Sequence, residues 1–330
     1  MKIQKSVGSG ERSTLRVAAV QVTSEDGKVT ENLRHATGFV EEAVARGAEF
    51  ILLPEFMPTG YSFTQEIWDA GEPREGPTVK WLRETSKRLG VWLGTSFLEA
   101  DGEDFFNTFV LTNPEGEEDG RVRKQTPATG EACFTRGEAG PHVINTKLGK
   151  VGVAICYENR FSYTPRNMYE QSVDLMLQPH AAIALKPDKI LFPPKIAELI
   201  NDFLHNVSSI YAGMLGIPVI YCNHSGQWRS AMPGLPFMKM DNPFYGFSSI
   251  SDSDGALKAQ LGAEEGVIVE DVILDPSLKK KVPPRTYGKW SMPNVPSAVK
   301  SWSLLEAIYG VWYRFSKERK LRARKLSPRK

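Results

Sequence analysis

Short apolar runs alternate with helical periodicities along the first part of the chain. Residues 15–22 and 49–55 are apolar runs of the length that buried strands have. Between them, residues 29–47 repeat apolar side chains at three- and four-residue steps and end at Gly47, a residue that commonly terminates helices. This strand–helix–strand unit predicts an α/β fold in which helices pack on the faces of a sheet.

The alternation continues to residue 274 without a linker or an internal repeat. The patterns predict further helices over 78–89 and 193–216, and strands over 91–97, 107–117 (with a turn), 120–124, 150–156, 174–179, 217–223, 246–255 and 266–274. Two irregular segments, 183–195 and 225–245, are expected to form pocket walls. We therefore predict a single α/β domain, with the boundaries 1–14 for a polar N-terminal segment, 15–275 for the domain, and 276–330 for an arm, an amphipathic helix and a basic tail.

The composition is that of an ordinary soluble globular protein. Of 330 residues, 41% are hydrophobic and 24% are charged, and no apolar run approaches the roughly 18 residues of a membrane helix. The polar N-terminus lacks the apolar core of a signal peptide. Cys133, Cys156 and Cys222 are too scattered for a disulfide framework or a zinc site, so we expect a reducing, cytoplasmic setting. The histidines lack metal-ligand spacing and the glycines form no phosphate loop, so we expect no metal and no cofactor.

Positive charge is concentrated at the C-terminus, where residues 317–330 hold eight Lys or Arg and one Glu. We interpret this tail as a solvated terminus; the alternative is a weak contact with nucleic acid or an anionic membrane. The rest of the chain shows no pattern typical of nucleic-acid binding. Just before the tail, six apolar residues form one predicted helical stripe: Trp302, Leu305, Ile308, Tyr309, Trp312 and Phe315. We expect this segment to dock on a second protomer rather than on a membrane surface.

Three groups with complementary chemistry stand at predicted strand ends: Glu55, Lys124 and Cys156. Loops at strand ends are where α/β proteins gather reacting groups. Each residue alone has an ordinary structural explanation, such as a cysteine that packs as a small apolar residue. Together they suit a thiol hydrolase, because a lysine lowers the pKa of a nearby thiol and a carboxylate can accept its proton.

The motifs around these residues resemble those of the nitrilase superfamily of carbon–nitrogen hydrolases. "LLPEFMPTGY", "RVRKQTPATGE" and "VGVAICYENRF" occur in the family's order, and the resemblance extends over residues 16–274. It implies an α-β-β-α sandwich with mixed central sheets. It also implies that Glu55 is the general base, Lys124 stabilises the oxyanion and Cys156 is the nucleophile.

The resemblance implies further site residues. Glu131, seven residues after Lys124, would orient the substrate and support the lysine, and the backbone N–H of Tyr157 would be an oxyanion donor. True nitrilases have tryptophan at the position of Tyr157, so the preference among nitriles, amides and carbamoyl compounds stays open. From its place after a predicted strand, His180 is a candidate pocket residue. Glu158 and Arg160 are expected to anchor the cysteine loop by ion pairing.

The predicted activity is cysteine-dependent hydrolysis of a small-molecule amide or nitrile to a carboxylic acid and ammonia or an amine, through a thioester. Two alternatives remain: an N-acyltransferase that uses the same thioester, and a catalytically silent binding protein with the same fold. The resemblance also implies a homodimer or larger homo-oligomer, with an interface helix within residues 160–172. No nucleic-acid partner is expected.

Overall fold

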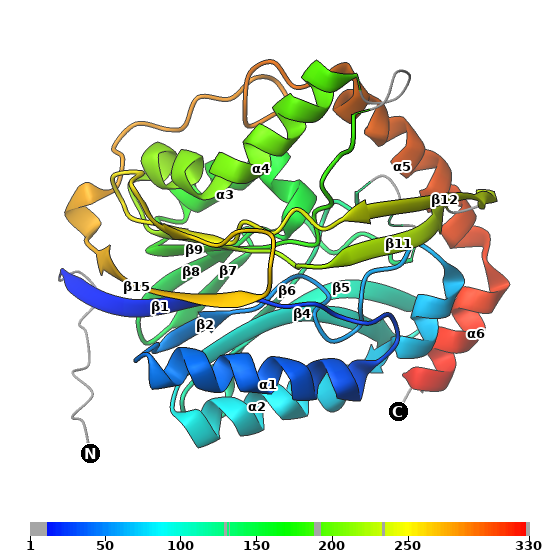
Figure 1. The fold of residues 1–330 in the computed structure, drawn as a ribbon, viewed down its shortest axis with the longest axis horizontal. Helices are drawn as coiled ribbons and strands as arrows, with labels where there is room; N and C mark the ends of the chain where they lie inside the picture. The colour runs from blue at the N-terminus through cyan, green and yellow to red at the C-terminus, as the bar shows by residue number, and fades with distance from the viewer. Residues whose placement is uncertain (1–11, 129–130, 132, 188–192, 233–234, 328–330) are drawn as a thin grey trace.

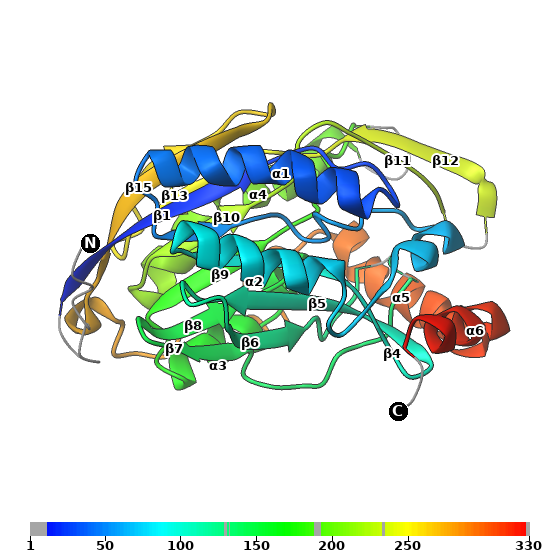
Figure 2. The same cartoon turned by 90° about the horizontal axis from the view of Figure 1, so that it is seen from below.

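The computed structural model describes residues 12–128, 131, 133–187, 193–232 and 235–327 (Figure 1). Two β-sheets pack face to face, and each carries helices on its outer face (Figures 1 and 2). The fold is thus a mixed α/β sandwich with the layers α-β-β-α, which confirms the predicted fold class. In the described part of the chain, every helix is too short or too polar to cross a bilayer.

The first sheet has the strand order β15-β1-β2-β4-β5-β6, and β3 pairs with β4. Strands β1, β2 and β4 are parallel because the helices α1 and α2 cross over between them. Both helices lie side by side on the outer face of this sheet (Figure 2). The bounds are β1 Ser13–Gln21, α1 Val29–Ala45, β2 Phe50–Leu52, β3 Glu72–Pro73, α2 Pro77–Leu89, β4 Trp92–Asp101, β5 Asp104–Thr112, β6 Glu118–Arg123 and β15 Gly266–Leu274.

The second sheet has the order β14-β13-β10-β9-β8-β7 and carries α3 and α4 on its outer face. Helix α4 ends at Gly216 in the left-handed conformation (φ 72°), as the glycine in the sequence predicts. The bounds are β7 Val143–Thr146, β8 Gly149–Val153, α3 Tyr163–Glu170, β9 Leu175–Pro179, α4 Pro194–Leu215, β10 Val219–Cys222, β13 Ser249–Ser251 and β14 Leu257–Gln260.

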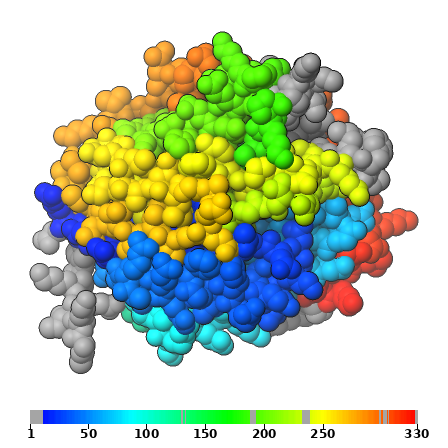
Figure 3. Space-filling model, viewed as in Figure 1, coloured from blue at the N-terminus to red at the C-terminus, as the bar shows by residue number. Residues whose placement is uncertain are grey.

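The main core lies between the two sheets. Val17 and Phe109 of the first sheet are fully buried in the same cluster as Val153 and Ile220 of the second. Separate apolar clusters fill the spaces beneath α1 and α2 and beneath α4. On the face seen in Figure 3, the blue side chains of α1 lie directly against the gold ones of β15. The strands that end near the centre of the sandwich are therefore packed on both faces, by the other sheet and by the outer helices.

Three sequence predictions of local structure are wrong. Of the strand predicted over 246–255, only β13 (Ser249–Ser251) forms. Within 225–245, predicted to be irregular, a hairpin forms from β11 (Gln227–Met232) and β12 (Leu235–Pro243). The strand predicted over 150–156 stops at Val153, because the backbone turns before the cysteine. Part of the other predicted pocket wall, 188–192, lies outside the described residues.

The C-terminal segment forms two helices, α5 (Ser297–Phe315) and α6 (Lys317–Leu326), which pack against the body. The basic tail, predicted to be a solvated terminus, is a helix over Lys317–Leu326 and is only partly solvated: Lys317 and Lys325 are exposed, but Arg319 is 3% exposed and its guanidinium binds Asp104 and the carbonyl of Glu103. Its planar ion pair fixes the start of α6.

The predicted apolar stripe on α5 does not form one buried face. Trp312 stacks on Trp68 with ring centroids 5.9 Å apart, whereas Ile308 is 54% and Phe315 is 76% exposed. The side chains of Trp302 and Leu305 lie outside the described part of the structure. Tyr309, the sixth member, is partly buried.

Candidate active site

The segment after β8 turns sharply at Cys156. Its φ is +51°, a left-handed conformation that costs a non-glycine residue of order 1–3 kcal/mol. The short 3-10 helix η2 (Cys156–Arg160) starts there. The Asn159 side chain holds the turn, because its Nδ2 donates to the carbonyls of Ala154 and Cys156, each at 3.0 Å. The strained turn therefore presents the thiol at a fixed position beyond the strand end.

Glu158 and Arg160 anchor this loop separately. The buried Glu158 carboxylate accepts hydrogen bonds from the backbone N–H groups of Ile155 (2.8 Å) and Gln125 (2.7 Å). Arg160 instead lies 4.0 Å over the Phe203 ring, and burial lowers its pKa to about 10. Glu158 and Arg160 thus anchor the loop through backbone and aromatic contacts instead of the expected ion pair with each other. Glu158 joins the segment after Lys124 to the loop of Cys156.

Glu55 follows β2 and is completely buried. Its Oε1 accepts hydrogen bonds from Lys124 Nζ and from Asn107 Nδ2, both at 2.7 Å, and its Oε2 accepts one from the backbone N–H of Ala181 at 2.9 Å. The backbone carbonyl of Glu55 accepts from the His224 ring at 2.6 Å. Both oxygens of the carboxylate are therefore fixed in direction by groups from different strands.

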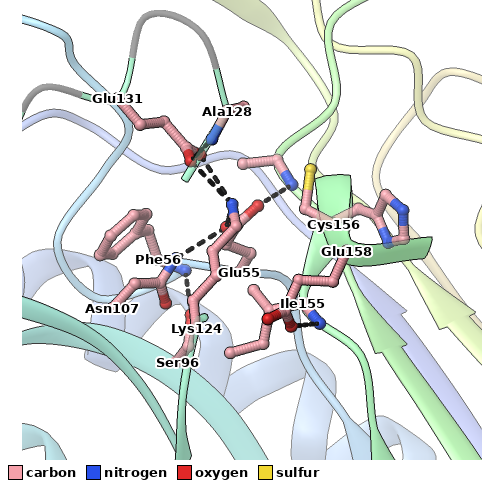
Figure 4. A network of polar contacts seen from close by, with 12 residues as sticks. Glu55, Phe56, Ser96, Asn107, Lys124, Ala128, Glu131, Ile155, Cys156 and Glu158 are labelled. Carbon is pink, nitrogen blue, oxygen red and sulfur yellow. Dashed lines mark hydrogen bonds and ion pairs between the residues drawn. The ribbon is translucent and has the colours of Figure 1, made fainter. Parts of the chain in front are cut away.

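Lys124 lies between two carboxylates. Its Nζ is 2.7 Å from Glu55 Oε1 and 2.8 Å from Glu131 Oε2, and none of the three side chains is exposed (Figure 4). Glu131 also accepts hydrogen bonds from the Tyr61 hydroxyl at 2.8 Å and from the backbone N–H of Ala128. Burial lowers the pKa of Lys124, but the charges of Glu131 and Glu55 outweigh burial and hold it well above its ordinary value. The lysine is thus a permanent ammonium.

The thiol of Cys156 lies beside this pair of opposite charges (Figure 4). Burial raises the pKa of Glu55, while Lys124 and a hydrogen bond with Cys156 lower it in part. Burial and then the charge of Glu55 raise the pKa of Cys156 well above its ordinary value, and the lowering effect of Lys124 is smaller. Lys124 thus lowers the pKa of the thiol in the expected direction, but the raising effects of burial and of Glu55 are larger. The resting state is a neutral thiol next to a carboxylate that can accept its proton.

The other two predicted site residues are close to these groups. His180 follows β9; its backbone carbonyl accepts from the Glu55 N–H at 3.3 Å, and its Nδ1 lies 3.0 Å from the Gln178 carbonyl. Burial lowers the pKa of His180 to about 3, so the ring is neutral. Tyr157, directly after the thiol, is buried, and its backbone N–H belongs to the first turn of η2.

Sequence reasoning missed several partners of the charged groups. Asn107 binds Glu55, and Tyr61 binds Glu131. A signal was present for Asn107, a polar side chain inside the apolar strand 105–111. In the described ranges, no three His, Cys, Asp or Glu side chains are grouped so that they could hold a metal ion.

A cavity of about 360 Å³ adjoins the Glu131 side of this network. Ala128, Glu131 and Phe134 line one wall, and Tyr309 and Tyr313 of α5 line another. Helix α5 also reaches the cysteine loop, because the Tyr157 hydroxyl donates to the carbonyl of Val299 at 3.5 Å. The C-terminal segment is therefore part of the surroundings of the site.

Three comparisons with known proteins bear on this geometry. The chain is 29% identical over 276 residues to N-carbamoylputrescine amidase of Solanum lycopersicum, covering 80% of this chain and 88% of that protein. It is 29% identical over 169 residues to a nitrilase of Pyrococcus abyssi, covering 50% of this chain and 64% of that protein.

In the third comparison, the fold matches an amidase variant from Nesterenkonia sp. AN1 with a TM-score of 0.62 and 22% identity, over 80% of this chain and 91% of that one. That structure shows covalent addition of the acetamide moiety of fluoroacetamide at the active-site cysteine. The carbon–nitrogen hydrolase family model matches residues 16–276, which include every residue of the network described above. The chain belongs to the carbon–nitrogen hydrolase family.

Proposed function

We propose that the protein hydrolyses a small-molecule amide or nitrile to a carboxylic acid and ammonia or an amine, through a thioester on Cys156. One observation carries the proposal: the buried ion-pair chain of Glu55, Lys124 and Glu131 lies beside the thiol. Burying three charged groups costs several kcal/mol per ion before pairing offsets it. Buried, perturbed charges next to a nucleophile are typical of active sites.

The first step is attack by sulfur on the carbonyl or nitrile carbon. As the Sγ–C bond forms, the thiol proton moves to the Glu55 carboxylate, whose pKa is raised by burial. A raised pKa makes the carboxylate a stronger base than an exposed one, and this compensates for the raised pKa of the thiol. The proton transfer and the attack are therefore coupled, and no stable thiolate is required beforehand.

Lys124 and the backbone N–H of Tyr157 stabilise the negative charge that develops on the substrate oxygen or nitrogen. The ammonium is already oriented by its two carboxylate partners, so it need not reorganise during the reaction. Protonated Glu55 then gives its proton to the leaving nitrogen as the C–N bond breaks. A nitrile takes up one additional water before the same thioester forms.

Water completes the cycle. Glu55, again a carboxylate, accepts a proton from a water molecule whose oxygen attacks the thioester carbon. The C–S bond breaks, the acid leaves, and Glu55 returns its proton to the sulfur of Cys156. Throughout, Glu131 keeps Lys124 in place, and the Tyr61 hydroxyl and Ala128 N–H keep Glu131 in place.

A substrate panel assayed for released ammonia tests the proposal. It should contain aliphatic amides, ω-amides, nitriles and N-carbamoyl amines, including N-carbamoylputrescine because a similar protein bears that name. We expect release with at least one class, and none from Cys156→Ala. Cys222→Ala, at another strand end, is the matched control and should keep its activity. Acyl transfer to an added amine without hydrolysis would instead indicate an acyltransferase, and absence of any turnover would indicate a binding protein.

Assembly and location remain predictions. We propose a homodimer or larger homo-oligomer that pairs through α3, the helix within the predicted interface segment 160–172. Sedimentation velocity of the full chain tests this, and a monomer at all concentrations would contradict it. A cytoplasmic location agrees with the three free cysteines, Cys133, Cys156 and Cys222.

A further inference from the structure

The outer face of α5 is an apolar surface that nothing in the described chain covers. Leu304, Ile308, Val311 and Phe315 are 67%, 54%, 50% and 76% exposed, and they recur at steps of four, three and four residues. This spacing places them on one side of the helix. We call these four residues the outer stripe. The opposite side of α5 holds the helix on the body, through Trp312 and Tyr313.

Helix α6 carries a further exposed apolar side chain. Leu321, on α6, is 61% exposed, and both helices lie together at one end of the molecule (Figures 1 and 2). Among the described residues between those of the stripe, Ala307 and Gly310 are exposed, small and uncharged, and Arg314 is exposed and basic. Contiguous apolar surface of this kind marks a contact site in a folded protein.

The exposed charges around the outer stripe are basic. Lys300 precedes the stripe, and Arg314, Lys317, Arg324 and Lys325 accompany and follow it; all five are exposed. The acidic side chains nearby are already paired. Glu318 binds Arg322 at 2.8 Å, Glu306 binds Arg136 on the inner side, and Glu103 binds Arg324, which offsets the charge of that arginine. The surface therefore combines apolar and positive character.

The basic charges around the outer stripe distinguish between two binding partners, a second copy of the chain and an anionic membrane. If a second copy packed its stripe against this one about a two-fold axis, a parallel arrangement would oppose Arg314 with Arg314. An antiparallel arrangement would bring Arg314 and Lys317 of each copy toward Lys300 of the other. Both arrangements oppose like charges, whereas an anionic membrane supplies apolar contact and negative charge together. The family resemblance favours a protomer contact for this segment, whereas the outward-facing residues of α5 and α6 favour a membrane surface.

We propose that α5 and the start of α6 dock on an anionic membrane surface. The outer stripe and Leu321 enter the boundary between headgroups and acyl chains, with the helices parallel to the membrane plane. Arg314, Lys317 and Lys325 contact lipid phosphates and carboxylates. The cavity beside Glu131 is lined by Tyr309 and Tyr313 on the inner side of the same helix and by Gly310 and Arg314 at its edge, so docking would take place beside the cavity.

Vesicle sedimentation of the full chain tests the proposal. We expect binding to vesicles of phosphatidylcholine with phosphatidylserine, little binding to phosphatidylcholine alone, and weaker binding as salt increases. Replacing Lys317 and Lys325 by Gln should weaken binding about fivefold for each charge removed. The double variant Ile308→Ser with Phe315→Ser should lose most binding, and because both side chains are exposed the thermal unfolding temperature should not change.

The matched control lies on β14, at another part of the surface. Leu257 is 48% exposed and Lys258 is exposed beside it, so Leu257→Ser with Lys258→Gln removes the same chemistry and should leave binding unchanged. Equal binding to both kinds of vesicle, or equal losses in the control, would overturn the proposal. So would absence of vesicle binding together with an oligomer that dissociates in the Ile308→Ser, Phe315→Ser variant, since the stripe would then be a contact between copies.

Discussion

At the scale of single residues, the proposed chemistry depends on where the thiol proton goes. The pKa of Glu55 is raised by burial above the 4.5 of an ordinary glutamate. Only the ionised form accepts a proton, so the rate of Cys156 alkylation by iodoacetamide should rise with pH through that raised value. Glu55→Gln should remove this rise and slow alkylation, and turnover should fall by about 10²–10⁴-fold. If the rate of alkylation rose with pH in Glu55→Gln as it does in the wild type, the role of Glu55 would be contradicted.

Glu131 gives a second test at this scale. Glu131→Gln removes one of the two charges that hold Lys124, and breaking a buried ion pair costs about 3 kcal/mol. The variant should remain folded because Glu55 still pairs with the lysine, but turnover should fall by about 10²-fold as the ammonium loses its orientation. Chemical denaturation and an ammonia assay measure the two effects. Asp101→Asn, which removes an exposed carboxylate from Arg123, should change neither; a Glu131→Gln variant with normal turnover would contradict the assignment.

Some of these residues could be predicted from the sequence and others could not. Glu55, Lys124 and Cys156 stand where strand patterns end, and the ends of neighbouring strands meet in an α/β fold. Asn107 and Tyr61 could not be placed in the same way. Asn107 reaches Glu55 only because β5 pairs with β4 next to β2, and Tyr61 reaches Glu131 through a loop. The net pKa of Cys156 depends on burial, which spacing does not reveal.

At the scale of elements, Glu72 ties β3 to the start of α2. Its buried carboxylate accepts hydrogen bonds from the backbone N–H (2.7 Å) and hydroxyl (2.6 Å) of Thr78, and burial raises its pKa to about 7. Between pH 4.5 and about pH 7, Glu72 stays protonated in the folded protein but is ionised in the unfolded chain. Stability therefore falls as pH rises across this window, by on the order of 3 kcal/mol.

Glu72→Gln should remove that pH dependence. Urea unfolding at several pH values should give a smaller decrease in the free energy of unfolding for the variant than for the wild type. Glu117→Gln, which changes an exposed carboxylate, is the control and should follow the wild type. If the free energy of unfolding fell equally with pH in the wild type and in Glu72→Gln, Glu72 would not titrate between pH 4.5 and about pH 7.

The contact of α3 with β8 gives a packing prediction. A Cβ added at Gly152 would lie within 3 Å of the Met168 sulfur, so Gly152→Ala should overpack this site and lower stability by about 1–3 kcal/mol. The compensating variant Gly152→Ala with Met168→Ala should recover part of the loss. Gly38→Ala on α1 has open space around it and should be neutral or stabilising by up to about 1 kcal/mol. Equal unfolding midpoints for Gly152→Ala and wild type would contradict the packing.

Helices with regularly spaced apolar residues were predicted from the sequence, and elements without such spacing were missed. The helices α1, α2 and α4 have apolar positions at helical steps, and the structure has them within a few residues of the predicted bounds. The hairpin β11–β12 was missed because its strands pair only with each other and alternate weakly in the sequence. Helix α6 was missed because seven of its ten residues are charged, and it packs through the buried Arg319 and Ala323.

At the scale of the whole molecule, the sandwich brings residues from distant parts of the chain to one place. Glu55, from the first sheet, binds the N–H of Ala181, which follows β9 of the second sheet. The hydrophobic core between the sheets fixes the strands, and the strand ends fix the charged side chains. The C-terminal helices then close the surroundings of Glu131 on one side and present an apolar, basic surface on the other. Such a division of roles within α5 could not be seen from the sequence stripe alone.

The central claim is that Cys156 forms a thioester, and mass spectrometry of the acid-quenched protein during turnover tests it most directly. With the best amide or nitrile of the panel, we predict an acyl adduct on the peptide that contains Cys156, present at steady state and lost when substrate is exhausted. The adduct should persist in Cys133→Ala and be absent from Cys156→Ala. An adduct on another residue, or undiminished turnover in Cys156→Ala, would contradict the account.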